Sequence, residues 1–276
     1  MRPLLGSAVV AVFLLLAAVP ASARPFQLVP IDATPLGVVE GATNMAVADL
    51  NGDGHLDAVA GAAPFAAFAA GLGGLSAAPL AVTPAGFRAA FVTAADVNGD
   101  GLADVVMTQY SPGALAVFLS DRSGGFSLAP GSPLAVGRIA WNPVIADFDS
   151  DRRPDIAVAL GADGEFIGLG DGTGRFVAGG RISAGSVPLA STSADLNGDG
   201  RPDLAVADYE TSAVAILLGD GHGGFTRHPA PASLSRSAPD AVVSSDFNED
   251  GRADLALTNA SAFVPEIGRA SCRERV

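Results

Sequence analysis

Oxygen-bearing side chains recur at alternate positions in five short stretches of the sequence. The stretches are DLNGDGHLD (49–57), DVNGDGLAD (96–104), DFDSDRRPD (147–155), DLNGDGRPD (195–203) and DFNEDGRAD (246–254). In each, positions 1, 3, 5 and 9 are Asp or Asn, and position 6 is Gly in four of the five. Ca²⁺ prefers about six to eight oxygen ligands, which a tightly coiled loop with side chains at alternate positions can supply. We therefore expect each stretch to form a loop that binds one Ca²⁺.

The expected ligands follow from the position of each residue in its stretch. Positions 1, 3, 5 and 9 would contribute side-chain oxygens, and position 7, whose side chain varies freely, would contribute its backbone carbonyl. The expected side-chain ligands are Asp49, Asn51, Asp53, Asp57, Asp96, Asn98, Asp100, Asp104, Asp147, Asp149, Asp151, Asp155, Asp195, Asn197, Asp199, Asp203, Asp246, Asn248, Asp250 and Asp254. The expected carbonyl ligands are those of His55, Leu102, Arg153, Arg201 and Arg252.

Two other interpretations of the acidic stretches are open. The calcium loop of an EF-hand begins in the same way, but it needs an acid at position 12 and a flanking helix. Position 12 is apolar in all five stretches and an apolar run follows position 9 directly, so the EF-hand interpretation fails. The stretches could instead be surface Asx turns without an ion. Several carboxylates close together repel one another unless a cation neutralises them, which favours the metal loop.

The third stretch departs from the pattern. Arg152 replaces the glycine of position 6, and Asp149 supplies a carboxylate where the other stretches have Asn. A residue other than Gly in the left-handed conformation costs about 1–2 kcal/mol. We expect this loop to bind Ca²⁺ most weakly, or to hold a guanidinium in place of the ion.

The five stretches mark an internal repeat. Their first aspartates, at 49, 96, 147, 195 and 246, are roughly 50 residues apart. A second motif follows at a nearly fixed offset, as in VFLSDRSGGF (117–126), IGLGDGTGRF (167–176) and ILLGDGHGGF (216–225), with a degenerate form at 67–75. Each repeat predicts an acidic loop, a strand such as 204–208, a second strand such as 213–219, a tight Gly turn and a further strand. Repeats of this length with four short strands are typical of β-propeller blades.

The two motifs together resemble the FG-GAP/VCBS repeat family, the blade type of the integrin α-chain head. The resemblance covers roughly residues 30–263, with the third loop and the first Gly turn as its poorest matches. It implies an all-β fold, a seven-bladed propeller of which about five blades are present, with calcium loops that stabilise the scaffold. We assign 24–265 to this incomplete propeller.

The two ends of the sequence carry different signals. Residues 1–23 combine Arg2, an apolar run from Leu4 to Val19 and a small-residue cleavage pattern ending at Ala23, which predicts a secretory signal peptide. Residues 266–276 resemble the translation of a sequencing-library adapter and are expected not to be native. They contain the only cysteine, Cys272, so we expect a secreted, extracellular or periplasmic protein without disulfides.

Composition and motifs narrow the function classes. The net charge of −13 argues against nucleic acid and anionic membrane surfaces as partners. No nucleophile elbow, zinc-spaced histidine pair or phosphate-binding loop is present. We expect a calcium-binding scaffold, without catalysis, for adhesion to a protein or glycan ligand. Two alternatives remain: the propeller portion of a polysaccharide-active enzyme, and a purely structural repeat of a larger surface protein.

Overall fold

The computed structural model describes residues 44–61, 67–69, 77–79, 84, 86–123, 125–229, 238–259 and 266–268. This part of the chain is all β apart from one short 3₁₀ helix, η1 (Gly161–Asp163). It contains no helix that is both long and apolar enough to span a membrane. The expected signal peptide at 1–23 lies outside the described residues, as does most of the degenerate turn at 67–75.

The strands form five antiparallel sheets that follow one another along the chain. The first sheet contains β1 (Asn44–Ala48), β2 (Asp57–Gly61), β3 (Ala67–Ala69) and β4 (Ala77–Pro79). The second contains β5 (Ala89–Ala95), β6 (Asp104–Gln109), β7 (Gly113–Ser120), β8 (Phe126–Leu128) and β9 (Leu134–Gly137). The third contains β10 (Pro143–Ala146), β11 (Asp155–Ala159), β12 (Glu165–Gly170) and β13 (Phe176–Ile182). The fourth contains β14 (Pro188–Ala194), β15 (Asp203–Asp208), β16 (Ala213–Gly219) and β17 (Phe225–Arg227), and the fifth contains β18 (Pro239–Ser245), β19 (Asp254–Asn259) and β20 (Glu266–Gly268).

The repeat predicted from sequence is present in every sheet. Each acidic stretch joins the first strand to the second, and position 9 is the first residue of the second strand, as with Ala146 opposite Asp155 and Ala194 opposite Asp203. The predicted strands at 204–208 and 213–219 correspond to β15 and β16. The prediction of an all-β chain built from repeated antiparallel sheets is thus confirmed.

Two sheets depart from the expected four strands: the second sheet has five and the fifth has three among the described residues. In the second sheet β9 adds a fifth strand beside β7, with Gly113 opposite Gly137. Gly113 permits this close approach, because a Cβ there would lie 2.8 Å from the carbonyl of Ile139. In the fifth sheet, β20 pairs with Leu255–Leu257 of β19. Residues 266–268 therefore add a third strand to this sheet.

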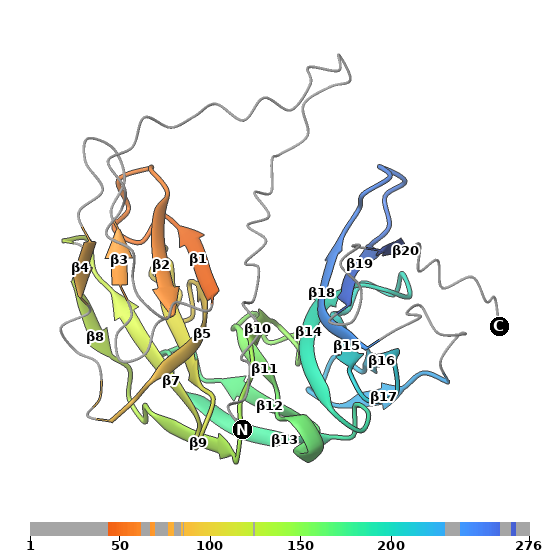
Figure 1. Ribbon diagram of the computed structural model, residues 1–276. Helices are drawn as coiled ribbons and strands as arrows, with labels where there is room; N and C mark the ends of the chain where they lie inside the picture. The colour runs from red at the N-terminus through yellow and green to blue at the C-terminus, as the bar shows by residue number, and fades with distance from the viewer. Residues whose placement is uncertain are drawn as a thin grey trace.

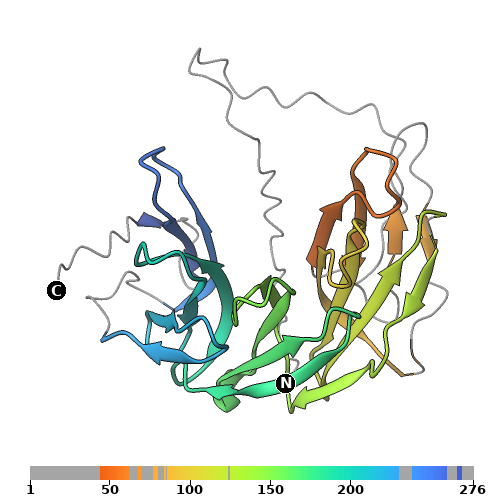
Figure 2. The same ribbon diagram turned by 180° about the vertical axis from the view of Figure 1, so that it is seen from behind.

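The five sheets stand side by side in an open arc, with the first and fifth sheets at its two ends (Figures 1 and 2). The first strands of neighbouring sheets contact one another, β1 with β5, β5 with β10, β10 with β14 and β14 with β18. Each of the three middle sheets thus presents one face to the preceding sheet and the other face to the following sheet.

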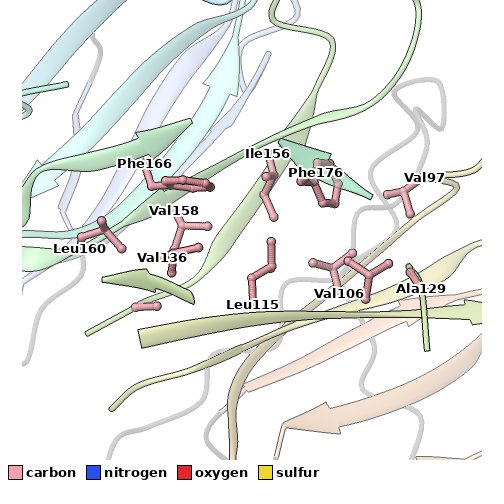
Figure 3. Packing of buried hydrophobic residues seen from close by; sticks show 12 residues of the cluster. Val97, Val106, Leu115, Ala129, Val136, Ile156, Val158, Leu160, Phe166 and Phe176 are labelled. Atoms are coloured by element: carbon pink, nitrogen blue, oxygen red, sulfur yellow. The ribbon is translucent and has the colours of Figure 1, made fainter. Parts of the chain in front are cut away.

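Four hydrophobic clusters fill the spaces between consecutive sheets. Between the second and third sheets, Val106 and Leu115 meet Ile156 and Val158, with Phe166 and Phe176 beside them (Figure 3). Because the second strand of a middle sheet faces a core on both sides, every residue of β6, β11 and β15 is buried. This explains why these strands have continuous apolar runs in place of alternating patterns.

Candidate metal loops

The first aspartate of each acidic stretch organises its loop. In all five loops one of its carboxylate oxygens, Oδ2, accepts a hydrogen bond from the backbone amide of position 6. The N–O distances are 2.9 Å for Gly54, 2.9 Å for Gly101, 2.9 Å for Arg152, 2.8 Å for Gly200 and 2.7 Å for Gly251. The other oxygen, Oδ1, accepts the amide of position 5, as Asp96 does from Asp100 at 3.2 Å. For Asp49 these amide hydrogen bonds, that of Gly54 first, lower the pKa of the carboxyl below its ordinary value.

The loops turn through two left-handed residues, of which sequence analysis identified one. Position 6 has positive φ throughout, as expected, and Arg152 adopts it at 68° where the other loops have Gly. Position 4 is also left-handed, with φ of 79° at Gly99, 64° at Ser150 and 60° at Glu249. The glycines at position 4 of three stretches were the sequence signal for this second turn. The third loop therefore holds two non-glycine residues in a conformation that costs about 1–2 kcal/mol each.

The side-chain oxygens of positions 1, 3 and 5 converge in the third loop. In the third loop, carboxylate oxygens of Asp147, Asp149 and Asp151 lie within 4.8 Å of one another, which makes it the one group of three acids with metal-site spacing among the described residues. In other loops position 3 is Asn, and in the second loop Asn98 Nδ2 donates to Asp100 Oδ2 at 2.9 Å. Partial burial, together with the charges of Asp151 and Asp147, raises the pKa of Asp149.

A guanidinium of the third loop itself pairs with one of the loop's carboxylates. Nη1 of Arg153 is 3.5 Å from Oδ2 of Asp151, and both side chains are partly exposed. An exposed ion pair of this kind contributes about 0–1 kcal/mol. It is compatible with the expectation that the third loop differs from the others.

The backbone carbonyl of position 7 was expected to bind the ion. The hydrogen bonds of position 7 in the structure are made by its backbone amide. The amide nitrogens of His55, Leu102, Arg153, Arg201 and Arg252 each donate to Oδ1 of the position 5 aspartate, at distances of 2.8, 2.8, 2.8, 2.9 and 3.0 Å. These Asx turns hold the position 5 carboxylate against the backbone two residues further along the chain. The ligand role of the position 7 carbonyl remains a prediction.

Position 9 has a structural role that sequence analysis missed. In Asp104, Oδ2 accepts the amide of Val97 at 3.0 Å and Oδ1 accepts the amide of Ser120 at 2.9 Å. Asp203 repeats the arrangement with Leu196 at 3.0 Å and Gly219 at 2.8 Å. This aspartate therefore ties the acidic loop to the end of the third strand of its own sheet. The carboxyls of Asp104 and Asp203 are fully buried, and burial raises their pKa values while the amide hydrogen bonds oppose that rise.

The third loop also contacts the neighbouring sheet. The amide of Gly223, in the Gly turn of the fourth sheet, donates to the carbonyl oxygen of Phe148 at 3.0 Å. In the same turn a Cβ on Gly221 would lie 3.1 Å from Oγ of Ser150. The acidic loop of one sheet and the Gly turn of the next thus form part of the junction between the sheets.

Comparison with known proteins identifies the repeat. A family model described as an FG-GAP-like repeat matches residues 96–158 and 195–257. Each match begins at position 1 of one acidic loop and runs through the next loop, so the matches contain loops two to five. The predicted repeat family is thereby confirmed for these regions. No curated protein matches the sequence.

Two solved structures illustrate more distant likenesses. The Vibrio cholerae biofilm matrix protein Bap1 is 18% identical with a TM-score of 0.47, over 79% of this chain and 35% of the Bap1 chain. The chain therefore spans about a third of the length of Bap1. An Agrocybe aegerita lectin that recognises non-reducing terminal N-acetylglucosamine is 17% identical with a TM-score of 0.41, over 79% of this chain and 75% of the lectin.

Proposed function

We propose that this chain of FG-GAP-like repeats is a secreted, calcium-stabilised β-propeller that serves as a binding scaffold for a protein or glycan. The observation that carries the proposal is the acidic loop, repeated at the same place in five sheets and coiled each time around its first aspartate. The side-by-side sheets with cores on both faces support the propeller, of which the arc would be a part.

The residues present fit a hard cation. Positions 1, 3 and 5 offer only oxygen atoms or an amide that can turn its oxygen inward, and in the third loop three carboxylates converge within 4.8 Å. At position 9 each carboxylate oxygen of Asp203 has two lone pairs and accepts one amide, which leaves one lone pair on each for an ion. A bound Ca²⁺ would offset two of the three or more carboxylate charges in each loop and crosslink positions 1 to 9. Asx turns without an ion are the competing interpretation.

A binding role fits the distribution of polar groups better than catalysis does. The acids of the loops are held by backbone amides, and the described residues contain no second group of three or more acids, histidines or cysteines with metal-site spacing. The alternative, the propeller portion of a polysaccharide-active enzyme, would place the catalytic groups elsewhere in the protein. Secretion is proposed from the apolar run that precedes Ala23.

The proposal is tested by thermal unfolding of the purified protein in calcium and in chelator. A ligand that binds only the folded state at 100 times its Kd adds about 2.7 kcal/mol for each site. We expect a large rise in Tm with calcium, reduced in Asp199→Ala. Asp171→Ala is the matched control, because it removes an acid from a Gly turn outside the acidic loops. An identical melting temperature with and without calcium would reject calcium stabilisation.

A further inference from the structure

All tryptophan and tyrosine residues of this chain lie at one end of the sheets. The sequence has one Trp and two Tyr. Tyr110 follows the last residue of β6, Tyr209 follows the last residue of β15, and Trp141 precedes β10. The acidic loops lie at the start of β6 and β15 and after β10, so the three aromatic residues occupy the opposite strand ends. We call these residues the aromatic end.

Trp141 is fixed at the junction of the second and third sheets. Its backbone amide donates to the carbonyl oxygen of Ala159 at 2.9 Å, and its carbonyl accepts the hydroxyl of Thr108 at 2.7 Å. Its ring lies 5.1 Å from that of Tyr110 at 75° and 5.6 Å from that of Phe91. The backbone hydrogen bonds hold the Trp141 chain in place, and the contacts with Tyr110 and Phe91 hold its ring, which lowers the cost of ordering this surface on binding.

The aromatic end is not part of the hydrophobic core. None of the four core clusters contains Trp141 or either tyrosine. Tyr110 is 44% exposed, and Tyr209, at the equivalent place in the fourth sheet, is 43% exposed. Single exposed aromatics are ordinary, but Trp and Tyr gathered at one end are typical of binding surfaces, because each offers a large apolar face and a polar group.

Hydrogen-bonding groups without partners accompany these rings. Among the described residues, Nε1 of Trp141 has no acceptor and Oδ1 of the adjacent Asn142 has no donor, and both atoms are buried. An unpaired buried polar group costs about 1–3 kcal/mol. Both atoms are shielded from the surface, so a ligand stacked on the rings would not pair with them directly.

The local charges favour a neutral ligand. Arg138, the charged side chain nearest in sequence to Trp141, is paired with Asp163 at 3.2 Å. Glu210, which follows Tyr209, adds a negative charge at this end. An anionic polymer would be repelled, whereas a neutral sugar combines apolar C–H faces for the rings with hydroxyls that both donate and accept hydrogen bonds.

We propose that the aromatic end binds a neutral glycan, with Tyr110 and Trp141 as the stacking surface and Tyr209 as a second contact in the fourth sheet. This inference rests on the proposed binding function and specifies its ligand and its site. The acidic loops at the opposite ends of the strands would then stabilise the scaffold without touching the ligand.

The experiment uses the single tryptophan as its reporter. The full protein in calcium is titrated with neutral oligosaccharides of glucose, mannose, galactose and N-acetylglucosamine, and with oligogalacturonate as the anionic comparison. We expect a saturable change in Trp141 fluorescence with at least one neutral sugar and none with oligogalacturonate. By calorimetry, Tyr110→Ala should weaken binding about tenfold or more, in line with the loss of a stacked aromatic contact.

Controls separate the site from the fold. Phe247→Ala removes an aromatic side chain that is 49% exposed at an acidic loop and should leave sugar binding unchanged. Tyr110→Phe keeps the ring and should retain most of the affinity if Tyr110→Ala is too unstable to study. Three results would overturn this inference and leave the proposed scaffold standing. They are equal affinity in Tyr110→Ala, preferential binding of the anionic sugar, or no response to any neutral sugar in a protein that still melts higher with calcium. Loss of the calcium effect itself would reject the scaffold.

Discussion

The hydroxyl of Ser191 in the fourth sheet donates a hydrogen bond of 2.7 Å to Oε1 of Glu165 in the third sheet. Glu165 is fully buried, and among the described residues its second carboxylate oxygen has no partner. Burial raises the pKa of this carboxyl from 4.5 to about 8, and the Ser191 hydrogen bond opposes the rise only in part. Burial in the seam between two sheets therefore favours the neutral form of Glu165 at neutral pH.

The raised pKa of Glu165 predicts a pH-dependent stability. Between about 4.5 and 8 the folded state holds a proton that the unfolded state has released, so stability falls as pH rises through this range. Each pKa unit corresponds to about 1.4 kcal/mol, so the total loss is at most several kcal/mol. Glu165→Gln, which keeps the shape without the charge, should match the natural protein at pH 5 and exceed its stability at pH 9. Chemical denaturation of both proteins across this range measures the difference. A difference that does not vary with pH would contradict the assignment.

Position 9 and position 5 of an acidic loop should respond differently to alanine. Asp203→Ala removes the acceptor of two amides and leaves that of Gly219 buried and that of Leu196 partly buried. It should destabilise the protein by about 1–3 kcal/mol for each amide, even in chelator. Asp199→Ala should lose mainly the calcium-dependent part of stability. Urea unfolding of both variants, with and without calcium, distinguishes the two roles; equal losses in chelator would argue against the structural role of Asp203.

The backbone of the third loop is expected to be strained. Arg152 and Ser150 have φ values of 68° and 64°. Arg152→Gly should relieve about 1–2 kcal/mol of left-handed cost, reduced by the greater chain entropy of Gly. We predict a net gain of about 0.5–1 kcal/mol in unfolding free energy. Gly200→Arg, the reverse change in the fourth loop, should be destabilising; a stabilising effect there would show that left-handed strain does not decide these loops.

The third loop should also rank last in calcium affinity. The strain in its backbone and the Arg153–Asp151 ion pair should both lower the calcium affinity of this loop, although its extra carboxylate should raise it. Asp151→Ala should therefore remove less bound calcium than Asp199→Ala, as measured by equilibrium dialysis at limiting calcium. Equal losses would refute the ranking.

Much of the fold followed from the sequence because the repeat is regular. The acidic loop fixes where β11, β15 and β19 begin, and the Gly turn fixes where β17 begins. The sequence repeat could not predict contacts between side chains of different sheets. Glu165 lies opposite Ala159 and Ile182 of the neighbouring strands, and only the structure brings Ser191 to it. The pairing of β9 with β7 depends on the space left by Gly113, which no periodicity records.

Some features of the acidic loops could likewise be predicted from the sequence, and others could not. Alternate acids predicted the coiled loops and the left-handed residue at position 6, because local spacing decides both. The hydrogen bond between Asp104 and Ser120 joins the acidic stretch to the Gly-turn motif of the same repeat. Because each motif was interpreted separately, the sequence predicted only a metal-ligand role for Asp104. The cluster around Trp141 combines residues from two repeats, and spacing within one repeat does not predict it.

Calorimetric titration of the purified protein with calcium tests the central claim most directly, because it counts ions. The acidic loops predict about four to five bound Ca²⁺, one for each loop, with the third loop filling last. Binding of that stoichiometry, absent for Mg²⁺ at the same concentration, would establish the loops as calcium sites. No measurable binding by a folded protein would contradict the claim and leave the aspartates as turn-forming residues alone.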